Sequence, residues 1–180
     1  MAAAWHANGQ KLAESNFRGG KAEGAATTWY ANGQKEGEGT FKDGKQDGLY
    51  TQWHENGVEK EKCTYKDGEL SGTSTMWHDN GQKLKEAIYR NGKVVGLVAK
   101  WYANGRKMAE YNYRDGKRDG PYTEWHENGQ LSEEGNFRDG ELDGLVTKWH
   151  ANGKKMAESN HKDGEHFAVR WWDENGNLIE

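Results

Sequence analysis

Long apolar runs and paired cysteines are both missing from this sequence. Cys63 is the single cysteine, so the chain has no internal disulfide and nothing indicates an oxidising compartment. No apolar run approaches the roughly 18 residues that span a bilayer. Residues 1–5 lack the basic and apolar segments of a secretory signal. We therefore expect a cytoplasmic protein without a membrane-spanning segment.

Aliphatic residues are also scarce. Leu, Ile, Val and Phe together make up about 12% of the chain, a level that is typical of disordered proteins. The net charge is only −4, however, and nine Trp and eight Tyr supply large side chains that bury about 150–250 Å² each. The composition therefore predicts an ordered chain with a thin core.

An excess of positive charge is likewise missing. The sequence has 25 Lys and Arg residues against 29 Asp and Glu residues, and it contains no basic run. Nucleic-acid binding normally needs a basic patch, and anionic lipid favours clusters of Lys and Arg. We therefore expect no nucleic-acid partner, and the acidic balance disfavours a membrane surface.

What the sequence has instead is a tandem repeat. Seven tryptophans follow one another every 24 residues, an eighth comes one residue early, and Asn-Gly follows each of them three positions later. These are Trp5, Trp29, Trp53, Trp77, Trp101, Trp125, Trp149 and Trp172. A fixed period of this length is the signature of a repeat architecture. It predicts a single array over residues 1–180, with repeats at 5–28, 29–52, 53–76, 77–100, 101–124, 125–148 and 149–171 and a partial repeat at 172–180.

Each repeat carries two hairpin signals. With Trp as position 1, the consensus has Asn-Gly at positions 4 and 5, Glu at 10, Phe or Tyr at 13, Asp-Gly at 15 and 16, and Gly at 20. Asn-Gly and Asp-Gly between extended stretches favour tight hairpin turns. Nothing long or periodic enough for a helix remains. The sequence predicts an all-β fold, a single elongated array of antiparallel β-hairpins that forms a twisted meander.

The length of the Asn-Gly loop decides which face of the sheet the tryptophans occupy. A two-residue loop sets Trp opposite position 8, and a three-residue loop reverses the parity. Both remain open, and we favour the two-residue loop. Position 8 is apolar in four repeats and polar in three: Leu12, Leu84, Met108 and Met156, then Glu36, Lys60 and Ser132.

The Asp-Gly region resembles MORN repeats. Residues 41–48 read Phe-Lys-Asp-Gly-Lys-Gln-Asp-Gly, similar to the aromatic, Asp-Gly and Gly pattern of that family, and Gly39 and Gly135 stand where it places a small residue. The Trp-(His/Tyr)-x-Asn-Gly segment and the 24-residue spacing resemble the MORN variant of bacterial YwqK-type antitoxins. The resemblance covers nearly the whole chain. It implies a hairpin array that acts as an interaction module, either neutralising a partner toxin or, as the alternative, associating with a membrane surface.

The array departs from its own pattern in three places. Lys62 replaces the Glu of position 10, and His161 replaces the aromatic residue of position 13. The last full repeat lacks Gly at position 20 and is one residue short near residues 165–167. We expect local irregularity there.

The repeated ionisable residues do not predict a reactive centre. Histidines at position 2 of neighbouring repeats would lie about 10 Å apart, whereas two imidazoles on one zinc need nitrogens within about 4 Å. The Glu column at position 10 suits a cross-strand charge ladder with the Lys of position 7, and Cys63 suits a packed core thiol. We expect no enzyme, no catalytic residue, no metal and no cofactor. Only His161, Glu165 and His166 depart from the repeat enough to form a separate constellation.

The interpretation is a non-catalytic repeat scaffold that binds another protein, a toxin being one such partner. Tyr and His at exposed strand positions suit interface anchors. The edge strands of an open sheet also predict edge-to-edge self-association. The predicted partner-binding residues are Tyr30, Tyr50, His54, His78, Tyr102, Tyr122 and His126.

Overall fold

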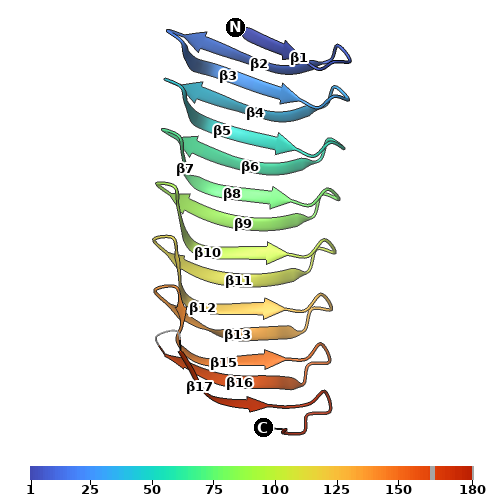
Figure 1. The fold of residues 1–180 in the computed structure, drawn as a ribbon, viewed down its shortest axis with the longest axis vertical. Helices are drawn as coiled ribbons and strands as arrows, with labels where there is room; N and C mark the ends of the chain where they lie inside the picture. Colours follow the sequence, from blue (N-terminus) through green and yellow to red (C-terminus); the bar gives the residue numbers. More distant parts are fainter. Residues whose placement is uncertain (163–164, 180) are drawn as a thin grey trace. The chain divides into compact units, whose positions relative to one another are not determined.

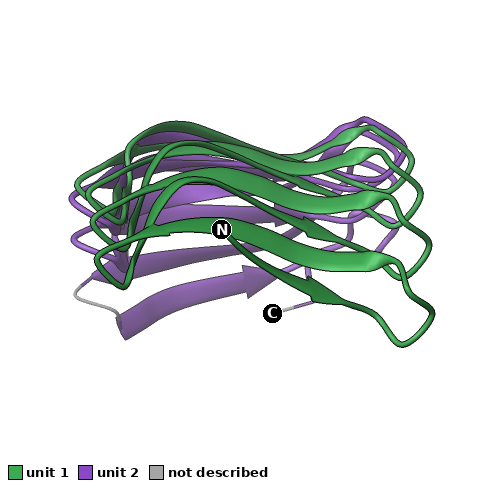
Figure 2. Ribbon diagram, turned by 90° about the horizontal axis from the view of Figure 1, so that it is seen from above, with its two compact units in different colours: residues 1–93 green, residues 94–180 purple. Residues whose placement is uncertain are grey.

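The computed structural model describes residues 1–162 and 165–179. Their contacts divide the chain into two compact units, Met1–Lys93 (unit 1) and Val94–Glu180 (unit 2), coloured separately in Figure 2. In the part of the chain that is described, every regular element is a β-strand, which confirms the all-β prediction. No helix there is long and apolar enough to cross a membrane.

Consecutive strands pair antiparallel within each unit, so that each unit is a β-meander (Figure 1). The strands of unit 1 are β1 (Ala2–Trp5), β2 (Lys11–Arg18), β3 (Lys21–Trp29), β4 (Lys35–Lys42), β5 (Lys45–Trp53), β6 (Glu59–Lys66), β7 (Glu69–Leu70), β8 (Gly72–Trp77) and β9 (Lys83–Arg90). Those of unit 2 are β10 (Lys93–Trp101), β11 (Lys107–Arg114), β12 (Lys117–Trp125), β13 (Leu131–Arg138), β14 (Glu141–Leu142), β15 (Gly144–Trp149), β16 (Lys155–Lys162) and β17 (Glu165–Trp171). Figure 2 shows that the strands of each unit curve along their length.

The Asp-Gly turns form as predicted. Asp43 and Gly44 have φ angles of 51° and 83°, and the residues on either side of them, Lys42 and Lys45, are direct partners in the ladder. Positive φ at both central residues defines the type I′ turn, whose twist matches that of the flanking strands. Asp is tolerated here because its short polar side chain reduces the cost of the left-handed conformation.

The two-residue Asn-Gly loop was the wrong prediction. Trp53 pairs with Glu59 at position 7, not with position 8, and the His54 N–H donates to the Val58 carbonyl at 2.8 Å. The loop therefore contains the three residues Glu55, Asn56 and Gly57, and the parity is that of the three-residue alternative. The Gly57 N–H donates to the His54 carbonyl at 2.9 Å, and the Val58 N–H donates to Oδ1 of Asn56 at 3.0 Å. Among the described loops of this kind only the glycine has a positive φ, for example 85° at Gly57. The Asn side chain bonds to the backbone two residues on, and this local turn competes with the type I′ geometry.

A bulge at position 20 bends each incoming strand. Gly39 pairs with Tyr50 and Phe41 with Gln46, so three residues of β5 stand opposite one residue of β4. Gly48 lies in this bulge with a φ of 115°, and a Cβ there would collide with the Thr40 hydroxyl. In the last full repeat Ala168 has a φ of 52°, a left-handed conformation that costs a non-glycine residue about 1–2 kcal/mol. The irregularity expected in this repeat is therefore present.

Strand alternation gives the sheet of each unit two distinct faces. Positions 9, 11, 13, 18, 22 and 24 share one face, which we call the groove face because it carries two apolar cavities described below. Positions 1, 7, 10, 12, 21 and 23 share the other, which we call the tryptophan face. The core is thin, as the composition predicted, and most of its buried residues belong to the groove face: Cys63, Ala87, Val98, Ala109, Tyr111, Tyr122, Val146 and Ala157.

Candidate binding surface

Within each unit, the aromatic residue at position 2 links a repeat to the next at the Asn-Gly loops. The hydroxyl of Tyr30 donates to the Trp53 carbonyl at 2.7 Å, and Nε2 of His54 lies 2.9 Å from the Trp77 carbonyl. Unit 2 repeats the pattern from Tyr102, whose hydroxyl lies 2.7 Å from the carbonyl of the next repeat's tryptophan. Tyr and His both present a polar N–H or O–H at a similar reach, which explains why they alternate at this position.

The loop asparagines form a second ladder beside the first. Nδ2 of Asn56 donates to the Asp79 carbonyl at 2.7 Å, one repeat further along, and Nδ2 of Asn128 donates in the same way to the Ala151 carbonyl. The amide therefore closes its own loop with its oxygen and bonds to the next loop with its nitrogen. Both contacts use the Asn amide group, because it has an acceptor and a donor. The bond to the next loop is a further reason why this loop differs from a two-residue type I′ turn.

On the tryptophan face, charged side chains are neutralised locally. Nζ of Lys35 bonds to Glu38 three residues later in the same strand and lies 5.7 Å from the ring centroid of Trp53 in the next repeat. The predicted charge ladder thus runs within each strand and not across strands. In the third repeat the two charges are exchanged: Glu59 stands at position 7 and Lys62 at position 10, and they form an ion pair at 3.6 Å.

The same face presents exposed aliphatic side chains at position 21. Leu49 in unit 1 is 53% exposed, and Leu145 in unit 2 is 52% exposed; Leu97 in unit 2 is similar. These leucines recur every 48 residues in the sequence. Ile88 at position 12 is exposed in the same way. No second layer covers this face in the described residues of either unit.

In unit 1 the groove face contains a cavity of about 170 Å³. It exists because Gly37 and Gly39 have no side chain, so that the ring of Tyr50 lies against the neighbouring strand. A Cβ at Gly39 would approach Cδ2 of Tyr50 to 3.1 Å. Tyr50 also packs edge-on against Tyr65, with ring centroids 6.1 Å apart.

In unit 2 aromatic rings fill the part of the groove face formed by β11, β12 and β13. Tyr122 is 4% exposed and stacks on Tyr111 with ring centroids 5.8 Å apart, and its hydroxyl donates to Glu133 at 2.5 Å. The Tyr111 hydroxyl donates to Glu124, and the guanidinium of Arg118 lies 4.1 Å from the Tyr111 ring centroid. Burial, followed by the hydrogen bonds to these carboxylates, raises the pKa of both tyrosines.

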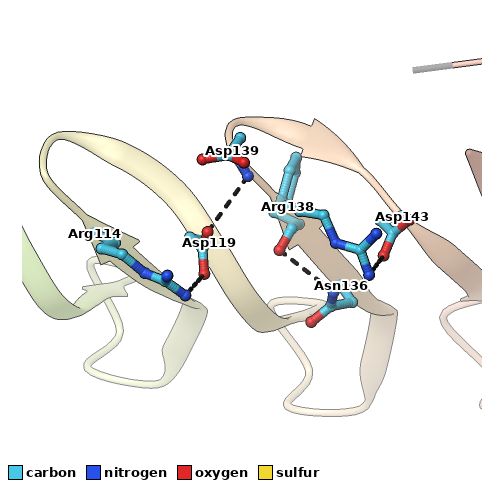
Figure 3. A network of polar contacts seen from close by, with 7 residues as sticks. Arg114, Asp119, Asn136, Arg138, Asp139 and Asp143 are labelled. Atoms are coloured by element: carbon cyan, nitrogen blue, oxygen red, sulfur yellow. Dashed lines mark hydrogen bonds and ion pairs between the residues drawn. The ribbon is translucent and has the colours of Figure 1, made fainter. Parts of the chain in front are cut away.

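At the Asp-Gly edge, acidic residues at position 19 connect successive repeats. Figure 3 shows Asp119 between two repeats: it accepts from Arg114 at 2.5 Å and from the backbone N–H of Asp139 at 3.4 Å. One repeat later, Arg138 pairs with Asp143 at 2.9 Å. These arginines are already engaged by carboxylates, which argues against an anion site at this edge.

The seven predicted partner-binding residues lie in two separate places. Tyr30, His54, His78, Tyr102 and His126 stand at the loop edge, where each is partly buried, whereas Tyr50 and Tyr122 lie on the groove face. The expectation that all seven are exposed was wrong for Tyr122, because the Phe137 ring, with its centroid 4.8 Å away, and Tyr111 cover it. The exposed leucines of position 21 were missed, although their 48-residue spacing was a readable signal.

Comparison with known families matches five segments of the chain to the MORN repeat variant: residues 22–43, 46–67, 70–91, 118–139 and 142–163. Together they cover more than half of the chain. The chain belongs to the MORN repeat variant family. Each matched segment of this MORN-repeat protein runs from position 18 of one repeat to position 15 of the next, and so contains one Trp, one Asn-Gly loop and one outgoing strand. No curated protein matches the chain.

The buried thiol of Cys63 gives a testable pH dependence. Cys63 is 2% exposed, and burial, followed by the charge of Glu61, raises its pKa from 9.0 to about 11. Because folding raises the pKa of this thiol, its burial stabilises the folded state fully below pH 9, where the thiol is protonated in both states. This stabilisation is lost as the pH rises from 9 towards 11, because the unfolded thiol then ionises first. We expect the wild type to lose about 1–2 kcal/mol more than Cys63→Ala between pH 7 and pH 10.5 in urea titrations.

The alanine variant is a matched reference because Ala87 occupies the same repeat position in the next repeat. The difference reports the thiol together with its effect on two neighbours, because the charge of Cys63 also contributes to the raised pKa of Tyr65 and of Tyr50. Equal losses for the two proteins would contradict the assignment of a raised thiol pKa.

Proposed function

We propose that this MORN-repeat protein is a non-catalytic scaffold that binds another protein, and that it acts in the bacterial cytoplasm as an antitoxin or immunity module. The observation that supports it is the uncovered tryptophan face with its recurring exposed leucines. Exposed apolar surface that gathers on one face marks protein interaction sites, whereas single exposed apolar side chains do not. The antitoxin role is proposed only from the resemblance of the Trp-(His/Tyr)-x-Asn-Gly segment to YwqK-type antitoxins.

The side-chain contacts favour binding over catalysis. On the groove face the ionisable groups of Tyr111, Tyr122, Glu124 and Glu133 are bonded to one another, whereas a catalytic group needs a free lone pair or proton aimed at a substrate. On the tryptophan face the lysines of position 7 are engaged by glutamates, as Lys35 is by Glu38. This neutral surface suits a protein partner better than anionic lipid.

The experiment replaces the exposed leucines by the residue that another repeat carries at the same position, Thr73. The variant is Leu49→Thr, Leu97→Thr and Leu145→Thr together. We expect the wild type to capture a stoichiometric protein from the source cell and the triple variant to lose it, because a leucine that an interface buries fully contributes about 1.5–3 kcal/mol of apolar burial, and losses at three such positions together weaken binding by more than tenfold.

The matched control is Lys45→Gln, Lys93→Gln and Lys117→Gln, three exposed changes at position 17, directly after an Asp-Gly or Asn-Gly turn, which should retain the partner. Capture that survives the leucine changes, or the absence of any stoichiometric protein, would refute the proposal. Sedimentation of the wild type with anionic vesicles would support the membrane alternative instead. For the antitoxin role, the captured protein should inhibit growth when it is expressed alone and not when it is expressed with this chain.

A further inference from the structure

The hairpin β16–β17 brings two histidines together on the groove face of unit 2. His161 and His166 are direct cross-strand partners, and their ring centroids lie 6.1 Å apart with the planes inclined at 43°. Cross-strand partners have Cβ atoms about 4.5–5.5 Å apart. This is the spacing at which small side-chain rotations bring two imidazole nitrogens onto one ion.

The other histidines lack this relationship. Those of position 2 occur once per repeat, so successive ones are separated by two strands, about 10 Å. Nε2 of His126 and of His150 also lies within 3.0 Å of the tryptophan carbonyl of the next repeat. A bound Zn²⁺ needs nitrogens at about 2.0–2.1 Å from the metal, a condition that the pair His161 and His166 approaches and the column does not.

The surroundings leave room for a ligand beside the two rings. They line a cavity of about 220 Å³ together with Leu142, Val146 and Trp171. The hydroxyl of Ser159 lies 2.8 Å from Nε2 of His161. When this hydroxyl accepts the Nε2 proton, Nδ1 of His161 keeps its lone pair, and such a second contact orients metal-binding imidazoles in general.

The charged groups around the pair are already partnered. Nζ of Lys148 bonds to Glu133 at 2.9 Å, so the nearest fixed cation is neutralised.

The fold does not need histidine at either place. Position 13 is Phe or Tyr in the preceding repeats, and position 18 is Gln46, Leu142 or another residue without an imidazole. We propose that His161 and His166 form a two-imidazole site for a divalent transition ion of the Zn²⁺, Ni²⁺ and Cu²⁺ class. The remaining coordination positions take water or a carboxylate from a bound partner. Imidazole ligands select these ions over Mg²⁺ and Ca²⁺.

The test is calorimetric titration of the full chain with Zn²⁺ and with Ni²⁺, together with the thermal midpoint at each metal concentration. The variants His161→Phe and His166→Gln each restore a residue that other repeats carry at that position, so both keep the fold. The control His150→Tyr places at position 2 the residue found there in Tyr30 and Tyr102, and it keeps a donor for the tryptophan carbonyl.

We expect the wild type and His150→Tyr to bind one equivalent that a chelator removes, with a rise in thermal midpoint, because an ion that binds only the folded hairpin stabilises it. His161→Phe and His166→Gln should lose both the binding step and the rise. Mg²⁺ should produce neither. The proposal is overturned if the wild type binds no equivalent, if either hairpin variant binds as the wild type does, or if His150→Tyr loses the step. This site is independent of the protein-binding proposal, and either can fail alone.

Discussion

Replacing Tyr122 with alanine is expected to lower the free energy of unfolding by about 3–5 kcal/mol, the range for removing a buried aromatic side chain. The ring of Tyr122 stacks on Tyr111 and contacts Phe137 at a centroid distance of 4.8 Å. Its removal opens a cavity in a core that has few other large side chains, and it leaves Glu133 without the hydroxyl that donates to it at 2.5 Å. Urea titration followed by circular dichroism would measure the loss.

Two further variants separate the causes of this effect. Tyr122→Phe keeps the ring and removes the hydroxyl, and it should cost only about 1–3 kcal/mol, because the hydrogen bond is to a charged acceptor. Phe17→Ala removes a ring that is exposed in unit 1 and should have a small effect. If Tyr122→Ala were no more destabilising than Phe17→Ala, the stacked rings would not form the core of this unit.

The second large effect is expected at Gly135, where alanine should destabilise the protein by about 1–3 kcal/mol through overpacking. A Cβ at Gly135 would approach Cε1 of Tyr122 and Cγ2 of Val146 to 2.9 Å each. Both neighbours are buried and belong to adjacent strands, so neither can move away without disturbing the stack. The thermal midpoint of Gly135→Ala should therefore fall.

Asn136→Ala is the matched control for this prediction, since it changes the next residue, whose side chain belongs to the opposite face of the same strand. Its midpoint should stay close to that of the wild type. A Gly135→Ala protein as stable as Asn136→Ala would show that the approach of the Tyr122 ring to the strand is looser than the structure indicates.

Much of the fold could be read from the turn residues. Asp43-Gly44 and its equivalents predicted two-residue hairpin turns, because positive φ at two successive residues is rarely tolerated by other pairs. Asn56-Gly57 gave the same signal and a different result. The Asn side chain bonds to the Val58 N–H and to the Asp79 carbonyl, and the second contact exists only after the next repeat is in place.

The candidate site was less predictable, because the exposure of its residues also depends on contacts with the next repeat. Strand alternation predicted that the position-2 residues, such as Tyr30 and His54, are exposed. In the structure a carbonyl of the next repeat lies within 3 Å of each of these two side chains. Tyr122 looked exposed because its burial depends on the absence of a side chain at Gly135 on the neighbouring strand. Contacts between strands decided the exposure of these residues.

By itself, the sequence determined that this protein is a β-hairpin repeat with a thin aromatic core, because the period, the Asp-Gly turns and the missing aliphatic residues are local or compositional properties. The tertiary structure decided the length of the Asn-Gly loop, the face of each tyrosine and tryptophan, and the pairing of His161 with His166. These features depend on register, and register follows from bonds and packing between strands that no single repeat contains.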